Sequence, residues 1–374
     1  MLYDPAAFEP LTDESWDDAR VRDAIAAIVA DADASFDSDA LWPAHEWDGY
    51  KAALPLKNFY LGAAGVVWAL DDLRRRGLAE TKLDLPAVAL DALDRWRAEP
   101  DYMEGEVVPE PGEAGLLTGE AGILLVACRL GHPLEDELRR LIRANLANEA
   151  EDLMWGTPGT LVAAVAMGWD DLARESAEVL ASRREPDGLW TQHLWGTSFR
   201  GLGTVHGLVG NVRALLEVDD PRNEALRAES AAALARAATR EDGLANWSSE
   251  GKLQWCAGAP GIVSAARDYL DEELLLAGSE LVWRAGPPGA EKGHGICHGT
   301  SGNGFALLAA FERTRDELWL DRARRFAVHG LAQAARMPGR YSLFTGGAGT
   351  ALFAAACLDA DPRYPVLERN LRAN

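Results

Sequence analysis

Three side chains able to bind a metal lie beside two Gly-x-x-Gly steps of this 374-residue chain. Cys256 stands two residues before the first glycine of one step, and Cys297, followed at once by His298, stands two residues before the first glycine of the next. Two thiolates and an imidazole supply three ligands to a tetrahedral Zn²⁺ and leave a fourth position open, as in catalytic zinc sites. Iron–sulfur clusters need more cysteines, and Ca²⁺ or Mg²⁺ prefer oxygen ligands. We therefore predict a zinc site at Cys256, Cys297 and His298.

The other two cysteines carry a different expectation. Cys128 and Cys357 lie inside apolar segments, where a free cysteine behaves as a small buried hydrophobe. We expect both to be inert core residues. The same interpretation is the alternative for the loop cysteines, but three donor residues at the same phase of a repeat favour a metal site.

Another pair of side chains could move protons. His206 directly precedes the first glycine of a further step, the place that His298 occupies in its own step. A helix N-terminus lowers the pKa of an imidazole, which suits a neutral base near pH 7. Asp152 lies four residues before Gly156 and could orient that histidine or bind substrate. The alternatives are a satisfied polar histidine in a loop and a solvated carboxylate.

Two lysines place cations beside the predicted metal. Lys292 lies five residues before Cys297, and Lys252 lies four residues before Cys256. Either ammonium group could bind a substrate carboxylate. The alternative is a solvated surface lysine.

Seven copies of the Gly-x-x-Gly step must position all of these residues. A repeat at this spacing is typical of an array built from one supersecondary unit. The steps are Gly62–Gly65, Gly119–Gly122, Gly156–Gly159, Gly207–Gly210, Gly258–Gly261, Gly299–Gly302 and Gly346–Gly349. An Ala- and Leu-rich segment follows each step and is apolar nearly all round, as expected for a buried helix.

A longer amphipathic segment accompanies each buried one, and no long alternating strand pattern competes. These segments lie near 17–33, 86–98, 135–150, 169–184, 224–240, 272–285 and 316–335. We predict an all-α fold, an (α/α)7 barrel or toroid of seven inner and seven outer helices. The glycines would open the inner helices and allow close backbone approach. The loops at the inner N-termini would then converge on one cavity.

Composition narrows the class of protein. A net charge of −22 argues against nucleic acid or an anionic membrane as partner. No apolar run is long enough for a membrane span, and the N-terminus does not resemble a signal peptide. Four cysteines without regular pairing are not a disulfide framework, so we expect a cytoplasmic protein. We expect a single domain over 1–374, with a repeat core of about 58–358 and an N-terminal outer helix of about 15–34.

The steps around these residues resemble the lanthionine synthetase C-like family, which comprises LanC cyclases and LanC-like proteins. The resemblance covers roughly residues 58–358. It rests on four segments: Gly-Ile-Cys297-His298-Gly-Thr-Ser-Gly-Asn303-Gly, Trp255-Cys256-Ala-Gly-Ala-Pro-Gly, His206-Gly-Leu-Val-Gly and Ser342-Leu-Phe-Thr-Gly-Gly-Ala-Gly. Ala257 departs from relatives that have His after the first Cys. We expect no attached dehydratase or kinase domain. We expect the protein to act alone or on a substrate prepared elsewhere.

The resemblance implies roles for the residues singled out above. It implies zinc on Cys256, Cys297 and His298, an acid/base at His206 with its carboxylate partner at Asp152, and a thiol or glutathione contact at Lys292. The implied reaction adds the thiol of a peptide Cys or of glutathione to a dehydroalanine or dehydrobutyrine in a dehydrated peptide or protein, forming a lanthionine-type thioether.

Two other functions stay open at this point. The same fold could be a non-catalytic scaffold that binds zinc and glutathione, and such a protein would tolerate loss of His206 and Asp152. A sugar enzyme with paired carboxylates in an α/α barrel would not need the Cys–Cys–His trio. Zinc content separates the sugar enzyme from the other two.

Overall fold

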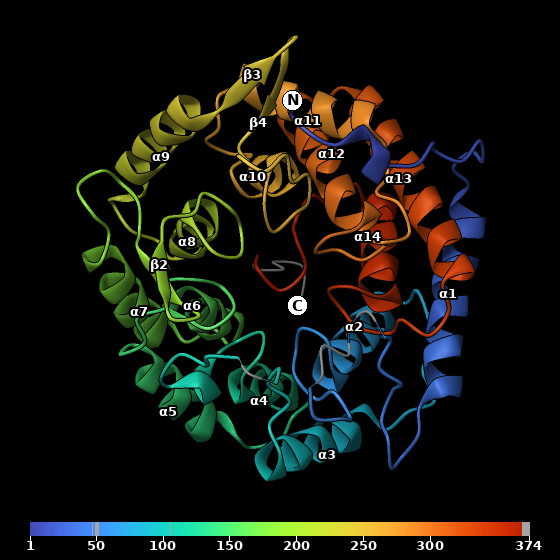
Figure 1. Cartoon of the computed structure of the whole chain (residues 1–374). Coiled ribbons are helices and arrows are strands. Elements are labelled where there is room, and N and C mark those ends of the chain that lie inside the picture. Colours follow the sequence, from blue (N-terminus) through green and yellow to red (C-terminus); the bar gives the residue numbers. More distant parts are fainter. Residues whose placement is uncertain (47, 49–51, 105, 369–374) are drawn as a thin grey trace.

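Seven inner helices form a closed ring in the computed structural model, which describes residues 1–46, 48, 52–104 and 106–368 (Figure 1). Each inner helix packs against the next one along the chain, and the last packs against the first. Nearly all their residues are buried, as their all-round apolar composition predicts. They are α2 (Ala63–Arg75), α4 (Glu120–Arg129), α6 (Thr157–Ala166), α8 (Leu208–Leu216), α10 (Ala259–Ala265), α12 (Thr300–Thr314) and α14 (Gly347–Asp359).

Seven outer helices surround this ring within the described part of the chain. They are α1 (Asp18–Ser35), α3 (Leu85–Ala98), α5 (Glu135–Asn145), α7 (Asp170–Ser182), α9 (Asn223–Ala237), α11 (Glu272–Ala285) and α13 (Glu317–Arg336). Each packs its apolar face on an inner helix, and α1, the first in sequence, packs on α14, the last. The predicted toroid of seven inner and seven outer helices is confirmed.

The glycine steps open the inner helices, as predicted. The first glycine of every step is the N-cap residue of its helix and has no side chain to cap it. At the second glycine, an added Cβ would collide with the carbonyl oxygen six residues earlier, in all seven steps. The close approach is therefore between each helix and its own preceding loop. The repeat needs glycine because that loop folds back onto the first helical turn.

The same loop residue also links neighbouring steps. The carbonyl of Trp255 faces Gly261 in its own step, and its Cβ would be 3.1 Å from a Cβ added at Gly302 in the next. Leu343 stands at this place in the seventh step and packs against Gly65 of the first. The seventh step thus contacts the first through the same loop position that contacts the next step elsewhere in the ring.

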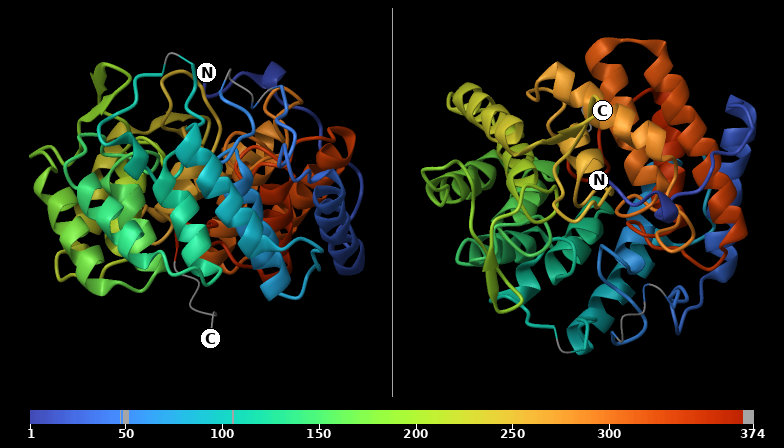
Figure 2. Two further views of the ribbon diagram at one scale, coloured as in Figure 1. Left: turned by 90° about the horizontal axis from the view of Figure 1, so that it is seen from below. Right: turned by 45° about the horizontal axis from the view of Figure 1, so that its top comes forward.

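Two short hairpins interrupt the helical pattern and were not predicted. Strand β1 (Gln192–Leu194) pairs antiparallel with β2 (Thr197–Phe199), and β3 (Thr239–Glu241) pairs with β4 (Leu244–Asn246). Strands of three residues are too short for an alternating pattern to show in the sequence. Figure 2 shows the toroid from the side, with long loops and hairpins on one face of the helical disc.

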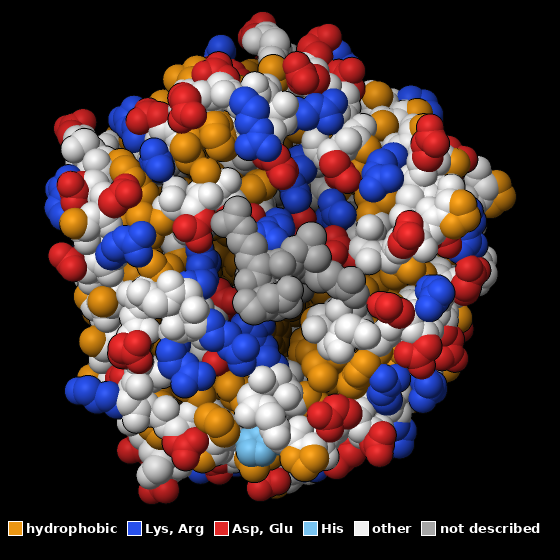
Figure 3. All heavy atoms as spheres, turned by 180° about the vertical axis from the view of Figure 1, so that it is seen from behind, with side chains coloured by type: hydrophobic (Ala, Val, Ile, Leu, Met, Phe, Trp, Pro, Cys, Tyr) orange, Lys and Arg blue, Asp and Glu red, His pale blue; other side chains and the backbone are white. Residues whose placement is uncertain are grey.

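The opposite face carries basic side chains around its centre (Figure 3). Inner helices end there, and several carry arginines in their last turn: Arg74, Arg75, Arg129 and Arg213. A cation at a helix C-terminus stabilises the helix dipole. These four arginines are ion-paired with Asp71, Asp72, Glu217 and Asp268. Each of these four arginines therefore already has a carboxylate partner.

Candidate metal centre and proton-transfer pair

The three predicted metal ligands meet in space. Cys256 and Cys297 occupy the same position in adjacent steps, and the Cys297 N–H donates to the Phe344 carbonyl of the step after. The two Sγ atoms and a ring nitrogen of His298 all lie within 4.8 Å of one another. Cys297 is buried, while Cys256 and His298 are partly exposed. Loop residues that are far apart in the chain therefore form one donor cluster.

This cluster fits a zinc ion. Zn–S and Zn–N bonds at the tetrahedral angle place a sulfur and a nitrogen about 3.6 Å apart, and Cys297 Sγ lies 3.6 Å from His298 Nε2. Soft thiolates with an imidazole are the donors that zinc prefers over hard cations. Three protein ligands leave one position for an incoming group.

Two polar side chains make hydrogen bonds to the cysteine sulfurs. Gln254 Nε2 donates to Cys256 Sγ over 2.9 Å, and Tyr60 hydrogen-bonds the Cys297 sulfur. Without metal, a hydrogen bond from Cys297 and the neighbouring His298 hold the pKa of Cys256 well below its usual value, although burial opposes this. Burial and the adjacent Cys256 sulfur raise the pKa of Cys297. The two sulfurs therefore differ in how tightly they hold a proton, and a metal ion would bind them as thiolates.

A segment after the last helix backs both donor loops. Tyr364 stacks on Trp255 with ring centroids 3.9 Å apart, and its hydroxyl donates to the Ile296 carbonyl over 2.7 Å. These two residues directly precede Cys256 and Cys297. Burial, together with the two sulfurs, raises the pKa of the Tyr364 phenol well above its usual value. Tyr364 therefore stays neutral and fixes the spacing of the two loops.

His206 and Asp152 form the second predicted pair. His206 Nδ1 lies 2.5 Å from Asp152 Oδ2, and Asp152 is completely buried. The other oxygen, Oδ1, accepts backbone N–H bonds from Met154, Trp155 and Gly156 at the start of α6. Four donors thus surround the carboxylate and fix its orientation. Since Asp152 accepts from Nδ1, the Nε2 atom of His206 is left for chemistry.

The proton-transfer pair lies beside the metal loops. A Cβ added at Gly203, three residues before His206, would be 2.5 Å from the Cys256 carbonyl oxygen. The loop that carries His206 therefore runs against the loop that carries Cys256. Both side chains of the pair come from the steps that precede the donor cluster around the ring.

The β1–β2 hairpin covers the histidine. Trp195 at its turn has φ 53° and sets its ring edge-on to His206, with centroids 5.1 Å apart. It stacks on Phe199 and hydrogen-bonds Glu106 from another loop. Gln192 at the base of the hairpin bonds both backbone groups of Glu151, the neighbour of Asp152. The β1–β2 hairpin thus contacts His206 through Trp195 and supports Asp152 through the backbone of the residue before it.

The lysines are placed differently from each other. Lys252 is 52 % exposed and ion-paired with Glu250 over 2.6 Å. Lys292 is half-buried in the turn before α12, and its ammonium makes no ion pair with any described residue. Of these two lysines, Lys292 is therefore the one whose charge is not paired with a described carboxylate.

Four positions near the site were not singled out from the sequence: Tyr60, Gln254, Trp195 and Tyr364. Tyr60 occupies the same place in the first step as Cys297 in the sixth, and Gln254 the same place as Asp152. Repeat phase could therefore have pointed to these two. Nothing in the repeat marks Trp195 or Tyr364.

The remaining two cysteines lie apart from the cluster. Cys128 and Cys357 are buried in α4 and α14. Burial raises the pKa of Cys128 to about 11 and that of Cys357 further. The prediction that both are inert core residues agrees with this environment.

Comparison with known proteins places the chain. The model of the family described as lanthionine synthetase C-like protein matches residues 15–368. The chain belongs to this family. It is 35% identical over 130 residues to the glutathione S-transferase LANCL1 of Danio rerio, a match that covers 31% of each protein. The structure of nisin cyclase superposes with a TM-score of 0.59 at 14% identity, covering 93% of this chain and 97% of that one.

These matches carry different weight. At 14% identity the nisin cyclase likeness establishes the fold of this lanthionine synthetase C-like protein and nothing finer. The chain's match to the Danio rerio relative spans about a third of that protein. None of the helices in the described residues is long and apolar enough to cross a membrane.

Proposed function

We propose that this lanthionine synthetase C-like protein is a zinc-dependent enzyme that adds a thiol to a dehydroalanine or dehydrobutyrine residue and forms a thioether. One observation carries the proposal: a Cys–Cys–His cluster with an open fourth position beside a buried carboxylate–histidine pair. The name of the nisin cyclase neighbour, a cyclase, agrees with thioether ring formation.

Cys256, Cys297 and His298 would hold the metal. When bound, Zn²⁺ lowers the pKa of a thiol and makes a thiolate available at neutral pH. Gln254 and Tyr60 would keep the two cysteine sulfurs in place through their hydrogen bonds. Tyr364 would hold the loops at the separation that the three donors need.

His206 would carry the proton. The reaction breaks one S–H bond and one C=C π bond and forms a C–S and a C–H bond, so a proton must travel from sulfur to the α-carbon of the dehydro residue. Nε2 of His206 takes the proton from the thiol and returns it to that carbon. Asp152 holds the ring through Nδ1 and stabilises the imidazolium while it exists.

Lys292 would bind the substrate, because its ammonium has no carboxylate partner among the described residues. Lys252, already paired with Glu250 at the surface, is a weaker candidate for substrate binding. The name of the Danio rerio relative, a glutathione S-transferase, favours glutathione as the thiol over a peptide cysteine. Glutathione carries two carboxylates that an unpaired lysine could meet.

The test is metal content measured beside turnover. Purified protein is expected to hold about one zinc per chain, and Cys297→Ala or Cys256→Ala should lose both metal and thiol addition to a dehydroalanine peptide. Cys128→Ala removes a buried thiol outside the cluster and should retain both. A Cys297→Ala variant with full zinc and full turnover would refute the metal site.

A zinc- and glutathione-binding scaffold without turnover is the second candidate, again favoured by the glutathione in the relative's name. It is separated from the enzyme by His206→Asn. An enzyme loses thiol addition in this variant while it keeps zinc and glutathione. A scaffold shows no addition in the wild type and the same glutathione affinity in the variant.

A further inference from the structure

A cavity of about 300 Å³ lies between α1 and the ring, apart from the metal centre. Its walls come from α1, α2, the end of α13 and the start of α14, and most are apolar: Ile28, Val29, Val66, Leu70, Leu73 and Leu331. An apolar cavity of ~150 Å³ stays dry and is large enough for benzene. This one has about twice that volume, and its apolar walls offer water few partners.

The cavity runs from the surface to a buried end. Its mouth includes exposed residues of two outer elements, Ala27 and Asp31 of α1 and Pro338 after α13. Its inner wall includes Ala69 and His294, which are 0% and 1% exposed. The pocket therefore has a mouth that includes the Asp31 carboxylate, mostly apolar walls, and a buried polar residue, His294, at its inner end.

His294 supplies the polar end. Its Nδ1 lies 2.9 Å from the Thr350 hydroxyl, whose oxygen lies 3.0 Å from the His294 carbonyl. The Thr350 hydroxyl reaches two carbonyl oxygens, those of His294 and Gly346, which can only accept, so we assign its hydrogen to a carbonyl and the proton of the Nδ1–Oγ1 bond to Nδ1. The ring is neutral, since burial and the nearby Arg340 lower the pKa of His294 to about 3. Nε2 is therefore a bare acceptor.

That acceptor has no partner. Nε2 of His294 is a buried nitrogen without a hydrogen bond in the described structure, and it has almost no accessible surface, so a ligand in the cavity reaches it only if the imidazole turns toward the cavity. A buried polar atom in this state costs free energy, so the site favours a ligand that brings a donor. Arg340 also lines the cavity, and the Asp48 carboxylate is already paired with it over 3.6 Å, so the buried end offers an ammonium no carboxylate of its own among the described residues. A neutral hydroxyl satisfies both conditions.

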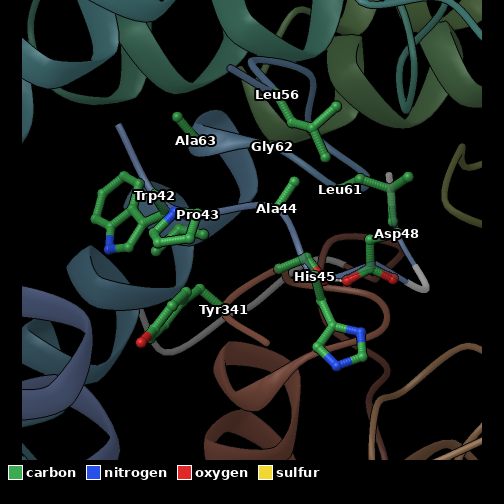
Figure 4. Close-up of a pocket in the computed structure, with 12 residues that line it drawn as sticks. Trp42, Pro43, Ala44, His45, Asp48, Leu56, Leu61, Gly62, Ala63 and Tyr341 are labelled. Carbon is green, nitrogen blue, oxygen red and sulfur yellow. Dashed lines mark hydrogen bonds between the residues drawn. The ribbon is translucent and has the colours of Figure 1, made fainter. Parts of the chain in front are cut away.

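A second pocket nearby does not compete for this role. It shares Tyr341 and Val66 with the larger cavity, is also lined by Trp42, His45 and Ala63, and holds only about 10 Å³ (Figure 4). That volume is enough for a single water molecule at most. The larger cavity is the one that can take an organic molecule.

We propose that the cavity beneath α1 binds a small apolar alcohol or phenol, with the ligand hydroxyl donating to Nε2 of His294 and its carbon skeleton lying among Val66, Leu70 and Leu73. A two-ring aromatic alcohol matches the volume, given that half of it suffices for benzene. His294 opens the loop that ends in Cys297 and His298, so an occupant would contact the segment that carries two of the three metal donors.

The probe is 1-naphthol, and 1-methoxynaphthalene is its partner without the donor hydrogen. Binding is measured by the change in probe fluorescence and by calorimetry on the full chain. Ala27→Trp closes the mouth, and Ala26→Trp places the same side chain on an exposed position of α1 that does not line the cavity. Wild type and Ala26→Trp should bind 1-naphthol with equal affinity, and Ala27→Trp should bind it at least tenfold more weakly. The wild type should bind the methyl ether at least about fivefold more weakly than the alcohol.

Each contrary result overturns a defined part. No binding of 1-naphthol to the wild type, which would leave water as the only occupant, refutes the site. Equal binding by Ala27→Trp places the ligand elsewhere and refutes it as well. Equal affinity for the alcohol and the ether refutes the hydrogen bond to His294. Thiol addition is not needed for any of these measurements, so they stand or fall apart from the catalytic proposal.

Discussion

The ring has a half that carries the donor and proton-transfer residues and a half built the same way without them. Steps three to six contain Asp152, His206, Cys256, Cys297 and His298, whereas steps seven, one and two place Phe344, Tyr60 and Leu117 where the cysteines stand. One series of backbone bonds crosses from one half into the other: Cys297 N–H donates to the Phe344 carbonyl, Phe344 N–H to Tyr60, and Tyr60 N–H to Leu117. Within the described chain, the halves differ in these side chains and in the two short hairpins, which lead into steps four and five.

This comparison separates what the scaffold supplies from what the site supplies. In the apolar half the same positions pack as core, for example Tyr60 stacked on Phe344 with centroids 4.8 Å apart. The repeat provides seven equivalent loops that converge on one another. The side chains just before the first glycine of each step decide whether that loop packs as core or carries a reactive group. The scaffold should therefore respond alike in both halves, and the chemistry should not.

The largest effect is expected from the glycines that both halves share. In Gly65→Ala the new Cβ would collide with the Phe59 carbonyl, and in Gly302→Ala with the Ile296 carbonyl. Both should lose about 3 kcal/mol or more of unfolding free energy, measured by urea denaturation. Gly77→Ala, at an open surface position, is the control for an added methyl, although its φ of 64° adds strain. A large loss in only one half would contradict the equivalence of the steps.

Removal of the proton-transfer pair should affect chemistry and spare the scaffold. His206→Asn or Asp152→Asn is expected to lower kcat for thiol addition by about 10²–10⁴-fold, the usual contribution of a positioned general base. Asparagine at 152 keeps an oxygen for the three N–H donors of α6. Zinc content should stay unchanged. His193→Asn, an exposed histidine of the hairpin, is the control and should keep full activity.

A pH dependence of stability is expected from Glu151, a buried acid beside Asp152. Burial raises the pKa of Glu151 to about 7, although its bond to Arg183 opposes this. Because the folded-state pKa lies above the unfolded value of 4.5, the folded state holds the proton more tightly. This contribution is present below pH 4.5 and is lost as the pH rises through about 7.

The variant Glu151→Gln mimics the protonated acid at every pH. Relative to it, the wild type should lose about 3 kcal/mol of unfolding free energy between pH 4.5 and pH 8. Urea denaturation at both pH values measures the difference. Exposed Glu149→Gln should show no such trend, and a wild type that gains stability over Glu151→Gln with rising pH would reverse the sign and refute the assignment.

The smallest effect is expected at the support behind the metal loops. Tyr364→Phe keeps the stack on Trp255 and removes only the bond to the Ile296 carbonyl, worth about 1 kcal/mol. Zinc affinity, measured by competition with a chelator, should fall several-fold. Tyr269→Phe is the control, because its buried hydroxyl has no hydrogen-bond partner in the described structure. Equal zinc affinity in Tyr364→Phe and wild type would limit Tyr364 to packing.

The sequence predicted what the repeat encodes. Periodic glycines and apolar segments located all fourteen described helices, and shared phase brought Cys256, Cys297 and His298 together before any coordinates. The partners outside the repeat could not be found this way. Trp195 sits in a hairpin of three-residue strands, and Tyr364 reaches the donor loops from a segment with no counterpart in the other steps.

Lys252 and Lys292 show a different limit. Both stand a few residues before a cysteine, yet one is exposed and paired with Glu250 while the other is half-buried. Distance along the chain does not say which way a loop side chain turns. The cavity beneath α1 is also beyond the sequence, because it arises where two outer elements fail to fill the space against α2 and α14.

The segment 361–368 supports both donor loops from chain that is made after all seven inner helices. The nascent chain therefore has Cys256, Cys297 and His298 before it has the side chain that stacks on Trp255 and bonds to the Ile296 carbonyl. Arg267, just after α10, pairs with Glu368 from the same late segment. The contacts that support the donor loops and the end of α10 can thus be completed only after the ribosome has passed α14.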